Sequence, residues 1–145
     1  MKKLLLLVTV LLTTVVAQAQ VWWGYFNESD FEVLDTSIGL GMPVPFMTGI
    51  YIPGNHEQVG SATVKAVRVY IVNGVSSTIS DMKVWIAKTL PTTLSDADYV
   101  QSITESLKDG ANEFTLTTPF AVNNQAFYIG YYINSSNEYP VRCGG

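Results

Sequence analysis

The chain has a single histidine, His56, and a single cysteine, Cys143, among its 145 residues. A zinc site needs three or four ligands, usually with paired spacing, and a catalytic histidine needs a nucleophile or an orienting carboxylate. No motif such as G-x-S-x-G supplies a nucleophile. A lone cysteine also excludes an internal disulfide; it indicates a free thiol, an intermolecular bond or a partner absent from this sequence. We therefore predict a protein that is not an enzyme, with no catalytic residue, no metal ligand and no cofactor.

Positive charge is scarce as well, with eight Lys and Arg against twelve Asp and Glu. Two of the basic residues, Lys2 and Lys3, lie at the extreme N-terminus. Without them six basic residues face twelve acidic ones, a net charge of −6. No basic cluster remains to hold a phosphate backbone, so nucleic acid is excluded as a partner. An anionic membrane surface would repel the chain for the same reason.

Helical periodicity is missing too, because no segment repeats apolar residues at i, i+3, i+4 and i+7 over three turns. The nearest candidate is "TLSDADYV", residues 93–100, for which we expect one or two helical turns. Ser95 would cap this helix and Asp96 would suit its first turn. Parallel βαβ units need crossover helices, which this sequence does not supply.

The N-terminal segment has the features of an export signal. Lys2 and Lys3 precede an apolar run from Leu4 to Val16, and Ala17-Gln18-Ala19 gives the small-x-small pattern of a cleavage site. The run is too short for a membrane span, which needs about 20 residues. We predict a signal peptide over residues 1–19, a mature chain that starts at Gln20 and has no membrane span, and a secreted or cell-surface location.

What the mature chain does contain is typical of β-structure. All 17 aromatic residues follow residue 20, among many valines, isoleucines and threonines. Short strand-like segments alternate with turn signals such as Pro53-Gly54 and Asn73-Gly74. This spacing predicts an all-β fold, a two-layer antiparallel β-sandwich that is jelly-roll-like, as one domain over residues 20–145. The expected strands are 21–26, 46–52, 63–72, 82–88, 98–104, 112–118, 126–134 and 139–143.

Side-chain alternation in these strands predicts the core. Residues 127, 129, 131 and 133 form one apolar stripe, and the residues between them form the opposite one. In residues 63–72 the phase breaks, because Val64 shares a face with Arg68 rather than with Val67. A bulge near Lys65–Ala66, or burial on both faces, would explain the break. The predicted core is Val69, Ile71, Val84, Ile86, Phe114, Leu116, Ile129 and Tyr131.

The polar loops offer weak candidates for chemistry. His56 follows Pro53-Gly54 and is expected to be a turn residue. Asp96 and Asp98, or the group after Lys108, would provide oxygen ligands for calcium or a glycosidase acid–base pair, but no spacing selects either arrangement. Asp96 is explained by a helix start and Asp109-Gly110 by a hairpin turn. A calcium ion held by carboxylates that converge only in the fold stays open.

Aromatic residues give the strongest indication of a binding site. Tyr128 and Tyr132 fall on one strand face, about 13 Å apart, with Gly130 between them. If the alternate residues are core, a two-layer sandwich leaves this face without a covering sheet. A sugar chain would then lie across both rings, with Gly130 leaving open space between them and Trp23 as a third contact; the alternative is that the rings only pack. The candidate ligand-binding residues are Tyr128, Tyr132 and Trp23.

Six short motifs are spread over most of the mature chain: Trp23-Gly24-Tyr25, Ile52-Pro53-Gly54, Val67-Arg68-Val69-Tyr70, Val84-Trp85-Ile86, Gly110-Ala111-Asn112-Glu113 and Tyr128-Ile129-Gly130-Tyr131. Together they resemble an N-terminal β-sandwich domain of secreted, multidomain surface proteins of Bacteroidetes bacteria. The resemblance implies a non-catalytic adhesion or carbohydrate-binding role, with a glycan or a surface protein as partner. It also implies that further domains of the same protein follow, so that this chain is a fragment.

Two function classes remain open at this point. The first is a secreted binding or adhesion module of the bacterial cell surface. The second is an accessory domain of a secreted hydrolase, either a protease or a glycosidase. A hydrolase needs reactive groups that converge in a concave pocket, whereas a binding module needs only an aromatic and polar surface. The single histidine and the single cysteine favour the binding module.

Overall fold

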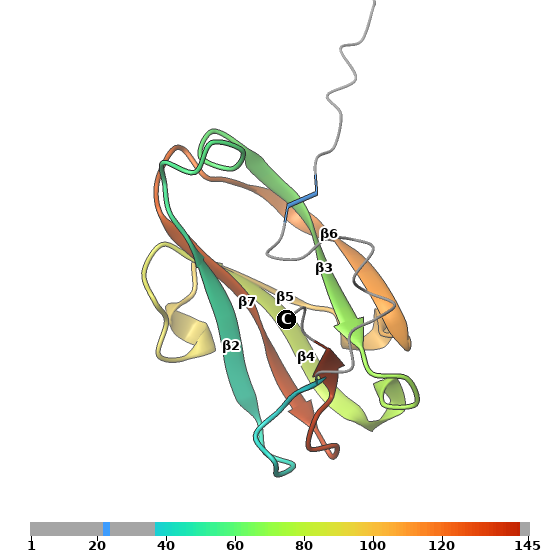
Figure 1. Cartoon of the computed structure of the whole chain (residues 1–145). Coiled ribbons are helices and arrows are strands. Elements are labelled where there is room, and N and C mark those ends of the chain that lie inside the picture. The colour runs from blue at the N-terminus through green and yellow to red at the C-terminus, as the bar shows by residue number, and fades with distance from the viewer. Residues whose placement is uncertain (1–21, 24–36, 143–145) are drawn as a thin grey trace, which may run out of the picture.

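The structure is a computed structural model that describes residues 22–23 and 37–142. These residues form two antiparallel four-stranded sheets, which confirms the predicted all-β sandwich (Figure 1). The β3 sheet has the strand order β1-β8-β3-β6, and the β7 sheet has the order β2-β7-β4-β5. The strands are β1 (Ser37–Ile38), β2 (Phe46–Ile52), β3 (Thr63–Ile71), β4 (Ile79–Ala87), β5 (Tyr99–Ser102), β6 (Gly110–Ala121), β7 (Phe127–Ser135) and β8 (Val141–Arg142).

The predicted strands agree closely with the observed ones where the structure describes them. The strand at 46–52 has the predicted bounds, and β3, β4, β6 and β7 lie within three residues of their expected limits. The strand expected at 21–26 lies mostly outside the described residues. β1 was not predicted, because two residues are too few to show alternation.

Helix within residues 22–23 and 37–142 is limited to three single 3₁₀ turns, η2 (Ser76–Thr78), η3 (Leu94–Asp96) and η4 (Thr104–Ser106). The helix expected over 93–100 is therefore only one turn, and its capping residue is Thr93 rather than Ser95. The Asp96 carboxylate accepts hydrogen bonds from Thr93 N at 2.8 Å and from Thr93 Oγ1 at 3.0 Å. Within the described ranges, no helix has the length and hydropathy needed to cross a membrane.

Pairing between β3 and β6 shows the predicted irregularity. Val64 pairs with Phe120, but Ala66 pairs with Thr115, so the register shifts between Val64 and Ala66. The shift moves the later part of β3 into the phase that buries Val69 and Ile71. This confirms an irregularity at the point where the alternation breaks, but the extra residues lie on β6, where residues 116–119 are opposite Lys65 alone.

The core lies between the two sheets. Ile71, Met82, Ile86 and Ile133 have no exposed surface, and Phe127 has 1%. Six of the eight predicted core residues are buried, while Ile129 and Tyr131 are half-buried and pack against the core. Both lie on β7, where they pair with Ile50 and Thr48 of β2.

Side chains of β5 close one edge of the sandwich. Gln101 Nε2 donates to Thr115 O at 3.1 Å, and Gln101 Oε1 accepts from Thr117 N at 2.9 Å. The hydroxyl of Tyr99 accepts from the same Thr117 N at 3.0 Å. β6 is an edge strand, and side chains of the other sheet form hydrogen bonds with its backbone. Fewer of its backbone N–H and C=O groups are therefore available to pair with another chain.

Candidate functional site

The candidate site is the outer face of the β7 sheet, which points away from the core. Phe127 and Ile133 point inward, so the alternate residues Tyr128, Gly130 and Tyr132 point outward. Directly paired residues of an antiparallel sheet share a face. The register therefore adds three residues of β2 and three of β4 to this face. These are Met47, Gly49, Tyr51, Lys83, Trp85 and Ala87.

Trp85 occupies the middle of the outer face. It pairs with Gly130, which in turn pairs with Gly49. A Cβ placed on either glycine would lie 2.7 Å from the indole ring, so the ring rests against the backbone of β7 and, beyond it, of β2. Trp85 is 1% exposed, and its buried Nε1 has no hydrogen-bond partner among the described residues.

This position of Trp85 corrects one expectation. Gly130 was expected to leave an open space between Tyr128 and Tyr132, but the indole fills that space. The alternation within β7 showed that Gly130 points outward. It did not show that a large side chain of β4 lies beside it, because the register between two strands is not visible in either strand alone.

Tyr51 and Tyr128 form a ring pair at one end of this face. They are cross-strand partners, with ring centroids 5.1 Å apart and ring planes inclined by 53°. Tyr51 is 49% exposed and Tyr128 is half-buried. The sequence analysis missed Tyr51, although Ile50 and Ile52 beside it gave a signal: inward isoleucines leave the residue between them pointing outward.

Tyr132 lies at the other end, next to charged side chains. It is half-buried, and Lys83 Nζ lies 5.3 Å from the centroid of its ring. Lys83 also forms a salt bridge with Asp81 on the same strand. The outer face thus has a ring pair at one end, a tyrosine with an ion pair at the other, and a buried indole between them.

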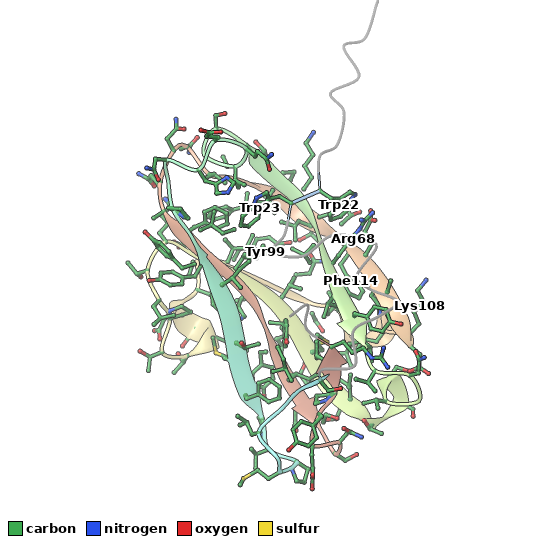
Figure 2. The ribbon with its side chains drawn as sticks, in the orientation of Figure 1. Trp22, Trp23, Arg68, Tyr99, Lys108 and Phe114 are labelled. Carbon is green, nitrogen blue, oxygen red and sulfur yellow. The ribbon has the colours of Figure 1, made fainter. Side chains whose placement is uncertain are left out.

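Trp23 lies elsewhere. Its ring packs edge-on against His56, with centroids 4.6 Å apart, and it contacts the core between the sheets. Figure 2 shows Trp22 and Trp23 next to Arg68, beside the β3 sheet. The structure therefore brings Tyr128 and Tyr132 onto one face but places Trp23 on the inner side of the sandwich. Trp23 and His56 instead border a shallow hollow with Asn55, Glu57 and Gln58.

His56 is a turn residue, as predicted. Its N–H donates to Pro53 O at 3.1 Å, and its carbonyl accepts from Gly60 N at 2.8 Å. Its ring Nδ1 accepts from Gln58 N at 3.3 Å. Across residues 22–23 and 37–142, no three Cys, His, Asp or Glu side chains are grouped so that they could hold a metal ion.

Two acidic loop residues, Asp98 and Asp109, accept hydrogen bonds from backbone N–H groups of neighbouring segments. The Asp98 carboxylate accepts from Lys88 N at 2.7 Å. The Asp109 carboxylate accepts from Gly74 N at 2.8 Å and from Ser76 N at 3.0 Å. Hydrogen bonds from the side chain and backbone of Ser76, and from Gly74, hold the pKa of Asp109 below its ordinary value of 3.8.

A second hollow lies on the β3 sheet, where Arg68 meets Glu113. Arg68 Nη2 is 3.1 Å from the Glu113 carboxylate, and the guanidinium lies 3.6 Å from the centroid of a Trp22 ring. Lys108 and Phe114 also border this hollow (Figure 2). Arg68 and Glu113 bind each other, and the lining of this hollow has no exposed ring pair like that of Tyr51 and Tyr128, so we take the outer face of the β7 sheet as the candidate site for a ligand.

Comparisons of the chain with protein-family models, with curated proteins and with solved structures find no match.

Proposed function

We propose that this domain is a secreted, non-catalytic binding module of a bacterial cell surface, and that it binds carbohydrate on the outer face of the β7 sheet. The observation that carries the proposal is the ring pair of Tyr51 and Tyr128, with centroids 5.1 Å apart. Its Tyr51 ring is half exposed to solvent. Exposed aromatic surface of this kind is uncommon on proteins that bind nothing.

The chemistry of the face fits a sugar. One side of a sugar ring presents mainly C–H groups, which pack against the electron-rich face of an aromatic ring. The hydroxyls around the sugar need polar partners, and Lys83 and Asp81 provide a donor and an acceptor at the far end of the face. Tyr128 and Tyr132 are four residues apart on β7, about 13 Å along the strand. That length suits several linked sugars better than a small molecule, which would favour an enclosed pocket.

Trp85 supports the face without touching the ligand. Its ring is 1% exposed, so a sugar would contact Tyr51 and Tyr128 rather than the indole. The indole of β4 rests on Gly49 of β2 and Gly130 of β7 and thereby links these three strands. A rigid platform of this kind reduces the entropy lost when the ligand binds.

The test is the double change Tyr51→Ala and Tyr128→Ala, measured on a glycan array and by thermal melting. We expect loss of binding with little change in the melting temperature, because Tyr51 is half exposed. Tyr132→Ala should weaken binding less. The matched control is Tyr139→Ala, which removes a tyrosine with a similar exposed fraction, 46% against 49%, from outside this face. A protein that binds no glycan on the array, or a control that loses as much binding as the double variant, would disprove the proposal.

A further inference from the structure

β2 is an edge strand with no charged residue near it. Residues 36–55 contain no Lys, Arg, His, Asp or Glu. Among the described strands β2 pairs only with β7, and Figure 1 shows β2 at one flank of the sandwich. Five of the eight exposed large apolar residues in the described part of the chain fall within residues 40–51, which are β2 and the loop before it. They are Leu40, Met42, Val44, Ile50 and Tyr51.

The other long edge strand that the structure describes is protected. Side chains of Tyr99 and Gln101 bind the backbone of β6. β5, the opposite edge of the β7 sheet, has only four residues. Natural edge strands avoid pairing with other chains by being short, charged, interrupted by proline or covered. β2 has seven residues, Phe46–Ile52, and is neither short, charged nor interrupted by proline.

We propose that two copies of this chain pair antiparallel through β2 and form one continuous eight-stranded sheet. A strand that pairs antiparallel with its own copy gives a closed two-fold interface, in which each contact occurs twice. Pairing centred on Gly49 places Ile50 opposite Thr48 and Tyr51 opposite Met47. The whole chain has a net charge of −4, so two copies repel each other in general. β2 has no charged residue, so no like charges meet where the two strands pair.

A second copy fits this edge better than an unrelated partner would. The edge carries no charge over its whole length, and Leu40, Met42 and Val44 extend the exposed apolar surface before β2 begins. The two-fold arrangement brings Ile50 and Tyr51 of both copies to the shared edge, so that the apolar area of each is buried twice. A charged partner would have to bury its charge against this surface without a counter-charge.

The first test is the oligomeric state of the exported chain, measured by analytical ultracentrifugation over a range of micromolar concentrations. We expect a concentration-dependent dimer. Ile50→Lys should weaken dimerisation by about tenfold or more, because two added charges would lie diagonally across the paired strands. The matched control is Val100→Lys on β5, since Val100 is 41% exposed and Ile50 is 39% exposed. This control should leave the dimer intact.

The second test does not depend on a variant that folds. Backbone amide hydrogen exchange of the unmodified protein is measured at low and at high concentration. Alternate β2 amides should become more protected at high concentration, and β5 amides should not change. A protein that stays monomeric throughout, a control that disrupts the dimer as strongly as Ile50→Lys, or β2 protection that is independent of concentration would overturn the proposal.

Discussion

The two faces of the β7 sheet bury large side chains in different ways. On the inner face Ile86, Phe127 and Ile133 are buried because a second sheet lies against them. On the outer face Trp85 is equally buried, although neither described sheet covers that side. It reaches this burial because Gly49 and Gly130 allow the indole to lie against the backbone. Packing on the inner face therefore depends on the volume of its side chains. Packing on the outer face depends on the missing side chains of Gly49 and Gly130.

The largest effect is expected from a side chain at Gly130. A Cβ there would lie 2.0 Å from Thr48 O and 2.7 Å from Trp85 Cζ2, and the first of these is a backbone atom. Gly130→Ala should therefore destabilise the fold by about 4 kcal/mol or more, or prevent folding, as judged by chemical denaturation.

The control for this change is Gly74→Asn. A Cβ at Gly74 meets nothing within 4 Å, and asparagine tolerates the positive φ of 80°. We expect a cost below about 1 kcal/mol there. Equal costs at the two glycines would show that the close approach at Gly130 does not matter.

A truncation on the inner face comes next. Phe127→Ala removes a ring that is 1% exposed and should cost about 3–5 kcal/mol in chemical denaturation, because the opposite sheet cannot close the cavity. Phe127→Leu should cost less than about 1.5 kcal/mol, because it replaces most of the volume. If Phe127→Leu lowers the free energy of unfolding as much as Phe127→Ala does, side-chain volume does not determine stability on this face.

Two substitutions of Trp85 distinguish the contribution of ring packing from that of hydrogen bonding. Trp85→Ala should cost about 3–5 kcal/mol by the same reasoning as for a core ring. Trp85→Phe loses volume but also removes a buried N–H that has no hydrogen-bond partner in the described structure. Its cost should fall below about 1.5 kcal/mol. A phenylalanine variant as unstable as the alanine variant would indicate that Nε1 has a partner.

The smallest effect concerns acid and should leave both faces intact. The pKa of Asp109 is lowered in the folded protein, so its contribution to stability is complete above the ordinary value of 3.8 and is lost as the pH falls through the folded pKa. Between the two values, Asp109→Asn should unfold with less dependence on pH than the unmodified protein. Identical pH dependence of the two proteins would contradict this.

The sequence predicted the fold because alternation and turn residues are local signals. Pro53-Gly54 marked the end of β2, and the break at Lys65–Ala66 marked an irregular pairing that the register shift confirms. The outward direction of Tyr128 and Tyr132 followed from the same alternation. The environment of these tyrosines did not, because the positions of Trp85, Tyr51 and Lys83 depend on which strands pair and in what register.

The environment of Trp23 was also not predictable from the sequence. It was grouped with Tyr128 and Tyr132 because all three are aromatic, but composition does not state which side of a sheet a ring approaches. In the structure Trp23 contacts His56 and the core. Thr93 and Ser95 illustrate a smaller case: both residues suit a cap, and the hydrogen bonds to Asp96 select Thr93.

The burial of Trp85 also has a spectroscopic consequence. An indole that water does not reach, with no hydrogen bond on its nitrogen, emits at shorter wavelengths than a hydrated one. Tyr128 and Tyr132 on the neighbouring strand lie close enough to transfer their excitation energy to the indole. Trp85 is therefore a built-in optical probe of the outer face, and its emission should shift to longer wavelengths when that face opens.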